Sequence, residues 1–240
     1  MNWPRRVKTA ADAVKFIDAA GYCLLFPIKK TALPSLYYAM ARRATLDWDA
    51  YGAKLWEWKD NIPRRRRAFY SKYFRGRGTF ISLKLLPHFL AMEGTGAVGG
   101  DHARMYAAGR ISADACAIWE TLDAQGPLAT LELRHACKMG SKAGNKRYKR
   151  AMLELSRALV VVHSGTEQET GAWASSRFEL TARAFPKQAA AARKIAREDA
   201  RAIIAAKYLE CYPSATPRVL ARLFRWTKAE ALAASGKSGE

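Results

Sequence analysis

Residues 112–181 contain five segments in order: SADACAIWETL (residues 112–122), TLELRHACKM (130–139), NKRYKRAMLELSRA (145–158), LVVVH (159–163) and RFELT (177–181). In the first three, apolar residues recur every three or four positions, as on the buried face of a helix. Ser112 and Thr130 stand at expected N-caps, and Gly126 and Gly140 stand at expected helix ends. The fourth segment, which is β-branched, and the fifth predict a two-stranded ribbon. Three short helices followed by a ribbon indicate a winged helix-turn-helix module over residues 111–182.

The flanking sequence repeats parts of this order. The first third predicts helices near residues 9–20, 33–43 and 48–61, then a Gly-punctuated ribbon within 62–82 and a short helix at 83–92 that contains Pro87. The Gly-rich residues 93–100 predict a domain boundary. Beyond the central module we expect one long helix at 186–208 and two short helices after Thr216 and Thr227.

These patterns predict a mainly α fold with small β-ribbons, in the α+β class, built from tandem winged helix-turn-helix elements. The expected domains are an N-terminal winged-helix-like region with a basic ribbon at 1–100, a central winged helix at 101–182, and a C-terminal helical region at 183–240 that packs on the others.

The charge balance favours a polyanionic partner. The chain has 41 Lys+Arg against 21 Asp+Glu, a net charge of +20. The excess is spread along the chain, with 20 against 8 in residues 1–110 and 21 against 13 in residues 111–240. A basic folded body gains affinity for nucleic acid by releasing condensed counterions. No apolar run is long enough to span a membrane and no signal peptide stands out. We therefore expect a soluble, cytoplasmic and nucleoid-associated protein with DNA as its partner and no membrane association.

Two basic clusters are candidate DNA contacts. The third helix of the central module occupies the position of a recognition helix, and its cations would neutralise phosphates while Asn145 could pair with a base edge. Its ordinary structural alternative is a solvated helix face. The candidates there are Lys142, Asn145, Lys146, Arg147, Lys149 and Arg150.

The second cluster lies in the first third, where cations alternate with aromatic residues, a pattern that suits single strands or a distorted duplex. The alternative is a strand pair with its aromatic residues inward and its cations outward. The candidates are Arg64, Arg65, Arg66, Arg67, Lys72, Arg75 and Arg77. The turn between the two strands of the central ribbon is instead acidic, with Glu167 and Glu169, and we expect Trp173 within it to pack on protein.

Catalytic and metal motifs are not evident. The sequence has no HxE, HExxH, GxSxG or P-loop pattern, and its four cysteines form no CxxC pair. Glu57 and Asp60 share one helix face, but solvated acids commonly do. Asp60 beside the arginine run is better explained as a charge partner or a helix-end residue than as a general base. We expect no metal site and no cofactor, and the cysteines are interpreted as small buried thiols.

Several strings resemble a known family, the winged-helix DNA glycosylases that excise alkylated bases and interstrand crosslinks (the AlkZ/YcaQ group), and especially its shorter relatives. The similarity lies in GYCLL (21–25), LWEWKD (55–60), FISLKLLP (80–87), the basic helix and ribbon at 145–181, and RAFP (183–186). The resemblance covers nearly the whole chain. It implies tandem winged-helix elements that form a concave basic surface around duplex DNA.

The resemblance also implies where catalysis would lie. In the family, a glutamine-x-glutamine or glutamine-x-aspartate motif after the first strand holds the water. Here the corresponding positions are Phe26, Pro27 and Ile28, and apolar side chains cannot position or deprotonate water. The family's histidine-containing segment falls near 80–82, without a histidine. No catalytic residue is carried over, so the catalytic residues stay unknown.

Three functions remain open. The favoured one is a DNA-binding relative of base-excision glycosylases that binds duplex or damaged DNA, with catalysis in doubt. The first alternative is an active glycosylase that removes alkylated or crosslinked bases with other groups, for example Asp47 or Glu57. The second is a winged-helix transcriptional regulator, although no obvious dimerisation helix is present and a monomer is expected.

Overall fold

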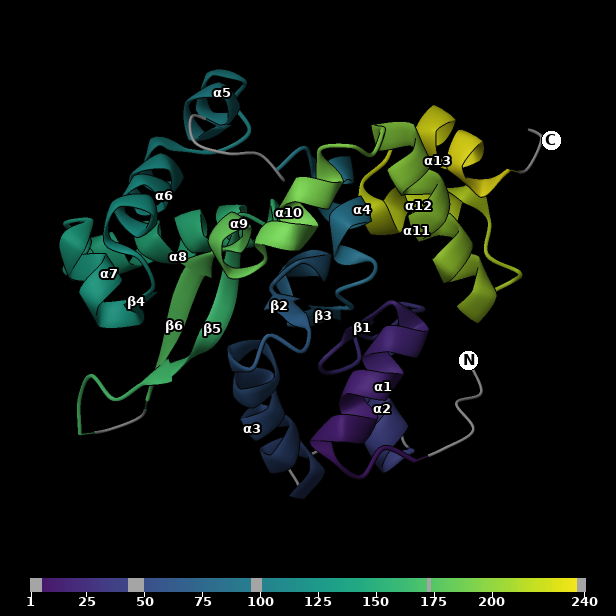
Figure 1. The fold of residues 1–240 in the computed structure, drawn as a ribbon, viewed down its shortest axis with the longest axis horizontal. Helices are drawn as coiled ribbons and strands as arrows, with labels where there is room; N and C mark the ends of the chain where they lie inside the picture. The colour runs from purple at the N-terminus through teal and green to yellow at the C-terminus, as the bar shows by residue number, and fades with distance from the viewer. Residues whose placement is uncertain (1–5, 43–49, 96–100, 172–173, 237–240) are drawn as a thin grey trace.

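The computed structural model describes residues 6–42, 50–95, 101–171 and 174–236. Helices dominate, and two small antiparallel sheets of three strands each complete the fold (Figure 1). The predicted class, mainly α with small β-ribbons, is confirmed. No helix among the described residues is both long and apolar enough to cross a membrane. Trp173 and Asp47 lie outside the described residues.

The first module is formed by residues 10–81. Its elements are α1 (Ala10–Ala20), β1 (Tyr22–Leu24), α2 (Leu36–Ala41), α3 (Ala50–Arg64), β2 (Phe69–Ser71), a 3-10 turn η1 (Phe74–Gly76) and β3 (Thr79–Ile81). A capping box between Thr9 and Asp12 begins α1. Gly21 ends α1 with φ +78°, and a side chain there would also meet Lys207 of the C-terminal region. The sheet has the strand order β1-β3-β2, with every pairing antiparallel.

The central module repeats that order. Its elements are α6 (Ala113–Gln125), β4 (Leu128–Ala129), α7 (Thr130–Ala136), α8 (Lys142–Arg157), β5 (Val161–Glu167) and β6 (Ser175–Leu180), preceded by α5 (Asp101–Ala107). Its strand order, β4-β6-β5, corresponds to β1-β3-β2 of the first module. Both modules therefore have the same succession: helix, strand, helix, helix, strand, strand. The tandem winged-helix assignment stays a prediction. The short strand β4 was not predicted, since two residues carry no usable periodicity.

The helix boundaries of the central module correct two expectations. Thr130 is the first residue of α7 and not its N-cap, and its hydroxyl donates to the Ser176 carbonyl at 2.8 Å. The segment before Asn145 is helical and not a turn, because the Ser141 side chain caps α8 by accepting from the Gly144 N–H at 3.0 Å. Gly144 lies so close to the Met139 backbone that a Cβ would be 2.7 Å from it. The candidate recognition helix thus begins at Lys142.

The C-terminal region is built from α9 (Thr181–Ala184), α10 (Pro186–Ala192), α11 (Arg197–Cys211), α12 (Pro217–Phe224) and α13 (Lys228–Ser235). The single helix expected at 186–208 is wrong: it is divided between Ala192 and Arg197. Both α10 and α11 pack on α4 (Leu86–Glu93). A single straight helix over residues 186–208 could not place both of these segments against α4. Pro87 lies in the first turn of α4, where a backbone N–H has no acceptor within the helix, so proline's lack of an N–H costs no hydrogen bond.

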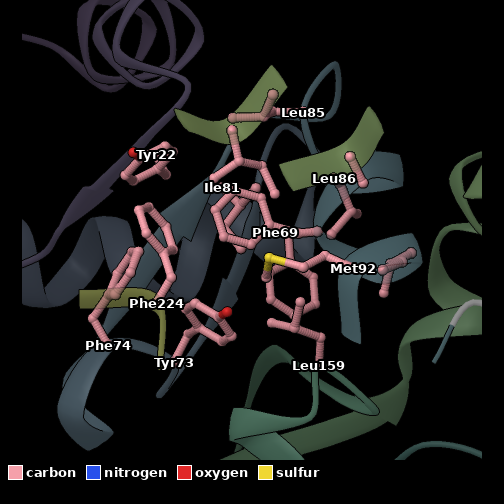
Figure 2. Packing of buried hydrophobic residues seen from close by; sticks show 14 of the residues in the cluster. Tyr22, Phe69, Tyr73, Phe74, Ile81, Leu85, Leu86, Met92, Leu159 and Phe224 are labelled. Carbon is pink, nitrogen blue, oxygen red and sulfur yellow. The ribbon is translucent and has the colours of Figure 1, made fainter. Parts of the chain in front are cut away.

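One hydrophobic cluster joins all three parts of the chain. Phe69 comes from the first module, Leu159 from the central module and Phe224 from the C-terminal region, and all three are buried in it (Figure 2). The clusters around α6 and α8 and around α1, α2 and α3 are separate. The division at residues 100 and 182 stays a prediction, but the shared cluster makes the C-terminal region part of the same packed body as residues 10–93.

Candidate nucleic-acid interface

The two modules meet along a polar and well-ordered contact. Helix α3 and strand β2 of the first module pack against β5 of the central module, and η1 packs against α8 (Figure 1). The buried hydroxyl of Ser71 lies 3.3 Å from the Ser156 carbonyl and 3.1 Å from the Val161 carbonyl. The hydroxyl can donate its one hydrogen to either carbonyl, so this serine of the first module links β2 to the segment between α8 and β5 of the central module.

A cavity of about 460 Å³ opens at this contact. Both modules supply its aromatic walls and its cations. Trp56 is 48 % exposed and lies over the Lys59 ammonium at 4.3 Å. The lining includes Trp56, Tyr70, Tyr148 and Phe178, with Lys59, Lys72 and Lys149. An aromatic cavity ringed by cations is suited to a ligand with a flat ring and an anionic backbone.

An ionisable network of three residues borders this cavity. The Asp60 carboxylate accepts from the Lys59 ammonium at 2.5 Å and from His163 Nε2 at 2.6 Å. Burial raises the pKa of Asp60, but the hydrogen bonds from His163 and Lys59 outweigh it, so the pKa lies below its usual value. Burial lowers the pKa of His163, and the nearby Lys59 and Lys72 charges act in the same direction. His163 is therefore neutral near pH 7, with Nε2 as donor and Nδ1 left as acceptor.

The sequence analysis found only half of this network. Asp60 was expected to be a charge partner, and the structure shows its partners to be Lys59 and His163. His163 was missed because 103 residues separate it from Asp60. Glu57, expected on the same helix face, instead accepts from the Asn61 side chain at 3.1 Å.

The candidate residues on α8 divide into free and paired cations. Lys142, Lys146 and Lys149 are exposed and have no partner among the described residues, and Asn145 is half-buried. Arg147 makes a two-pronged contact with Asp114 of α6, with Nε 2.9 Å from Oδ2. Arg150 contacts Glu154 at 3.3 Å. The hydrogen bond from Arg147 lowers the pKa of Asp114. No acid near Arg147 in the sequence indicated this pairing.

The arginine run at the end of α3 does not form one surface. Arg64 and Arg66 line a cavity of about 150 Å³ beside Arg177, and Arg66 lies 3.8 Å from Glu179. Arg65 and Arg67 line a different cavity beside α1. The four side chains therefore point to two sides of the first module.

The ribbon that follows also separates its cations from its rings. Phe69 and Phe74 are buried in the core, so the structural alternative, aromatic residues inward and cations outward, is what the structure shows for them. Lys72 reaches the inter-module cavity. Arg75 donates to the Thr31 hydroxyl at 3.0 Å, and Arg77 is exposed.

The acidic turn between β5 and β6 stabilises the N-terminus of α7. The Glu169 carboxylate accepts from the backbone N–H groups of Leu131 and Glu132, each at 2.8 Å. It supplies the N-terminal cap of α7 that the local sequence does not provide. Burial raises the pKa of Glu169, but these hydrogen bonds and one from Ser175 bring it below its usual value. The acid in this turn therefore stabilises α7.

The positions that correspond to the family's catalytic motif are apolar in space as well as in sequence. The rings of Phe26 and Tyr37 lie 5.8 Å apart, and Ile28 packs on the large hydrophobic cluster. The adjacent cavity, about 240 Å³, has no carboxylate or amide side chain among its described lining residues, which are Phe16, Pro27, Leu33, Pro34, Ser35, Tyr38, Ala39 and Tyr212.

One group of possible metal donors was not predicted. His102, Cys116 and Glu120 bring a nitrogen, a sulfur and an oxygen to within 4.8 Å of one another. The Cys116 thiol already lies 3.7 Å from the Glu120 carboxylate, and burial and that carboxylate raise its pKa. The expected absence of a metal site stays a prediction.

The chain belongs to the AlkZ-related family, whose pattern it matches over residues 7–225. Its structure is similar to the Streptomyces sahachiroi DNA glycosylase AlkZ, with a TM-score of 0.53 and 15 % sequence identity. That similarity covers 97 % of this chain and 60 % of AlkZ, so the chain spans about three fifths of that protein. No curated protein matches the sequence. The family resemblance inferred from the sequence is confirmed.

Proposed function

We propose that this protein binds DNA, with a preference for damaged or distorted duplex, along the surface that surrounds the inter-module cavity. The observation that carries the proposal is that Lys149 of α8 and Lys72 of the ribbon, from separate predicted clusters, line one cavity with aromatic walls. A monomeric state and a cytoplasmic, nucleoid-associated location are part of the proposal.

Each part of the surface has a distinct role in the proposal. Three lysines of α8 are free to neutralise phosphates: Lys142, Lys146 and Lys149. Arg147 and Arg150 can do so only after their ion pairs with Asp114 and Glu154 break. Trp56, which is half-exposed, provides a ring on which an unstacked base can lie. A distorted site exposes such a base at a smaller unstacking cost than an intact duplex does. Arg65 and Arg67, on the α1 side, are expected to contribute less than Lys72 and Lys149.

Replacing Lys72 or Lys149 by glutamine is expected to weaken DNA binding and to flatten its salt dependence. Each neutralised phosphate contributes about −0.9 to the slope of log K against log salt concentration, so each variant should lose about one unit of slope. Fluorescence anisotropy across a salt series measures this. Lys228→Gln, on the exposed side of α13, is the matched control. An unchanged slope in both variants would contradict the proposed surface.

The preference for distortion is tested with three duplexes of one sequence: intact, abasic and mismatched. Tighter binding to the abasic and mismatched forms is expected, and Trp56→Ala should reduce that preference more than it reduces binding to intact DNA. If none of the three duplexes binds at moderate salt, the proposed function is wrong.

A second candidate function is cleavage of a base–sugar bond. It is favoured by the Asp60–His163 pair, because the carboxylate holds Nε2–H and leaves Nδ1 as the basic nitrogen. This is the reverse of the Ser-His-Asp arrangement, in which the carboxylate holds Nδ1–H and Nε2 is the base. In this reaction a water attacks the sugar C1′, Nδ1 of His163 accepts its proton, and the C1′–N bond breaks with its electron pair leaving on the base. The positions 26–28 take no part.

The assay incubates the protein with alkylated DNA and then treats the DNA with hot alkali, which breaks the strand at abasic sites. His163→Gln keeps an N–H donor for Asp60 but has no basic nitrogen, so it is expected to lower the rate by about 10²–10⁴-fold without abolishing DNA binding. Absence of strand breaks with several lesions would leave binding as the function.

A further inference from the structure

A second cavity, of about 510 Å³, shares no lining residue with the inter-module cavity. It is enclosed by the ends of α4 and α8, by α11, and by the chain from α12 to α13, so all three parts of the protein border it. Its most unusual property is its charge. Five arginines line it: Arg110, Arg157, Arg197, Arg201 and Arg225.

The three carboxylates in the same lining are already committed to the protein. Glu93 accepts from the Tyr73 hydroxyl at 2.7 Å and lies 3.6 Å from Arg225. Glu154 accepts from the backbone N–H and hydroxyl of Ser112, at 2.9 and 2.6 Å. Glu230 closes the capping box of α13. The cavity therefore keeps an excess of positive charge, with its acids held in place.

Some of the donors in this lining have no acceptor. Arg157 has no carboxylate or carbonyl partner among the described residues, although it is only partly exposed. Arg201 is 8 % exposed, and its Nε–H is buried without a partner in the described part of the chain. The indole N–H of the buried Trp226 is in the same situation. A buried donor that lacks an acceptor is unfavourable, and a ligand with several acceptor oxygens would satisfy it.

We propose that this cavity is a binding site for a phosphate group. A phosphate presents several acceptor oxygens to donors that approach from different directions, and guanidinium groups are the side chains best matched to it. Arg157 binds the group directly, and the buried Arg201, whose terminal nitrogens contact Glu198 and Glu230, offers its unpartnered Nε–H. The inference does not require DNA binding at the inter-module cavity, since a free phosphate ester and a phosphate of a nucleic acid share this chemistry.

The first arm of the test uses inorganic phosphate. Thermal unfolding is followed as phosphate replaces chloride at constant ionic strength, with wild type, Arg157→Gln and the exposed control Arg218→Gln. Because a ligand that binds only the folded state raises Tm, Tm should rise in wild type and in Arg218→Gln and rise less in Arg157→Gln. A general salt effect would raise all three equally. The loss of one charged contact should weaken phosphate binding about tenfold or more.

The second arm distinguishes the source of the phosphate. The same variants are titrated with oligonucleotides that carry or lack a 5′-phosphate. If Arg157→Gln binds DNA more weakly than wild type but shows the same rise in Tm with phosphate, the site binds a phosphate of nucleic acid. If Arg157→Gln loses part of the rise in Tm but binds DNA as wild type does, the site binds a free phosphate ester. If Arg157→Gln behaves like Arg218→Gln in both arms, the cavity is a closed network of ion pairs and the proposal is overturned. Arg157 has no described partner to lose, so its variant should remain folded.

Discussion

Replacing Phe224 by alanine is expected to lower the free energy of unfolding by about 3–5 kcal/mol, the range for a buried phenylalanine that leaves a cavity. Phe224 is 3 % exposed, and its ring lies 5.6 Å from that of Phe74 and 5.9 Å from that of Tyr22 (Figure 2). It also stacks on Trp226 at 4.6 Å. The lost contacts are those by which α12 joins the first module.

Urea unfolding followed by circular dichroism measures the change. Ile203→Ala, on the exposed side of α11, is the control, because Ile203 is 46 % exposed and its loss should change stability by less than about 1 kcal/mol. We also expect a biphasic transition in Phe224→Ala, in which the C-terminal helices unfold first. A change as small as that of Ile203→Ala would show that α12 is not anchored by this ring.

The second large effect is expected at the Lys59–Asp60–His163 network. Asp60→Ala leaves the Lys59 ammonium, whose side chain is 9 % exposed, without its counter-charge. Removing one partner of a buried ion pair costs about 3–5 kcal/mol, and the partial exposure of Asp60 reduces this to about 2–4 kcal/mol. Asp60→Asn keeps an acceptor for both neighbours and should lose less. Equal stability of wild type and Asp60→Ala would show that the network contributes nothing to the module contact.

The network also fixes the direction of the pH dependence. Both Asp60 and His163 have folded-state pKa values below their unfolded ones, so the unfolded chain binds more protons and stability falls as the pH falls. The contribution of His163 is complete above its unfolded pKa of about 6.5 and is lost below it; that of Asp60 is lost only below about 3.9. His163→Gln should remove the first decline, measured as ΔG against pH, and leave the second. A decline that persists just below pH 6.5 in that variant would assign it to another group.

The features that sequence predicted are those with local causes. The start of α13 after Thr227 and the apolar faces of α6 and α8 follow from residues a few positions apart. The apolar character of residues 26–28, which follow β1, was also evident from the sequence, because it is a property of three consecutive side chains. What could not be predicted depends on distant partners. Asp114 holds Arg147 across 33 residues, and α10 and α11 separate because both must pack on α4.

The same limit applied to the candidate site. Two basic clusters were visible in the sequence, but only the fold shows that Lys72 and Lys149 face one cavity while Arg65 and Arg67 turn toward α1. His163 had no motif that marked it, and its proximity to Asp60 exists only when β5 packs on α3.

The Ser71 link has a consequence for any duplex that this surface accepts. Because the hydroxyl is buried and lies close to two carbonyls of the other module, the distance between Lys72 and Lys149 is set by the protein and not by the ligand. Under the proposed function, DNA would have to bend or open to suit this spacing, and the energy of that deformation depends on local stiffness. A fixed spacing between the two lysines would then make a weakened base pair easier to bind than an intact one, with no side chain needed to read the base itself.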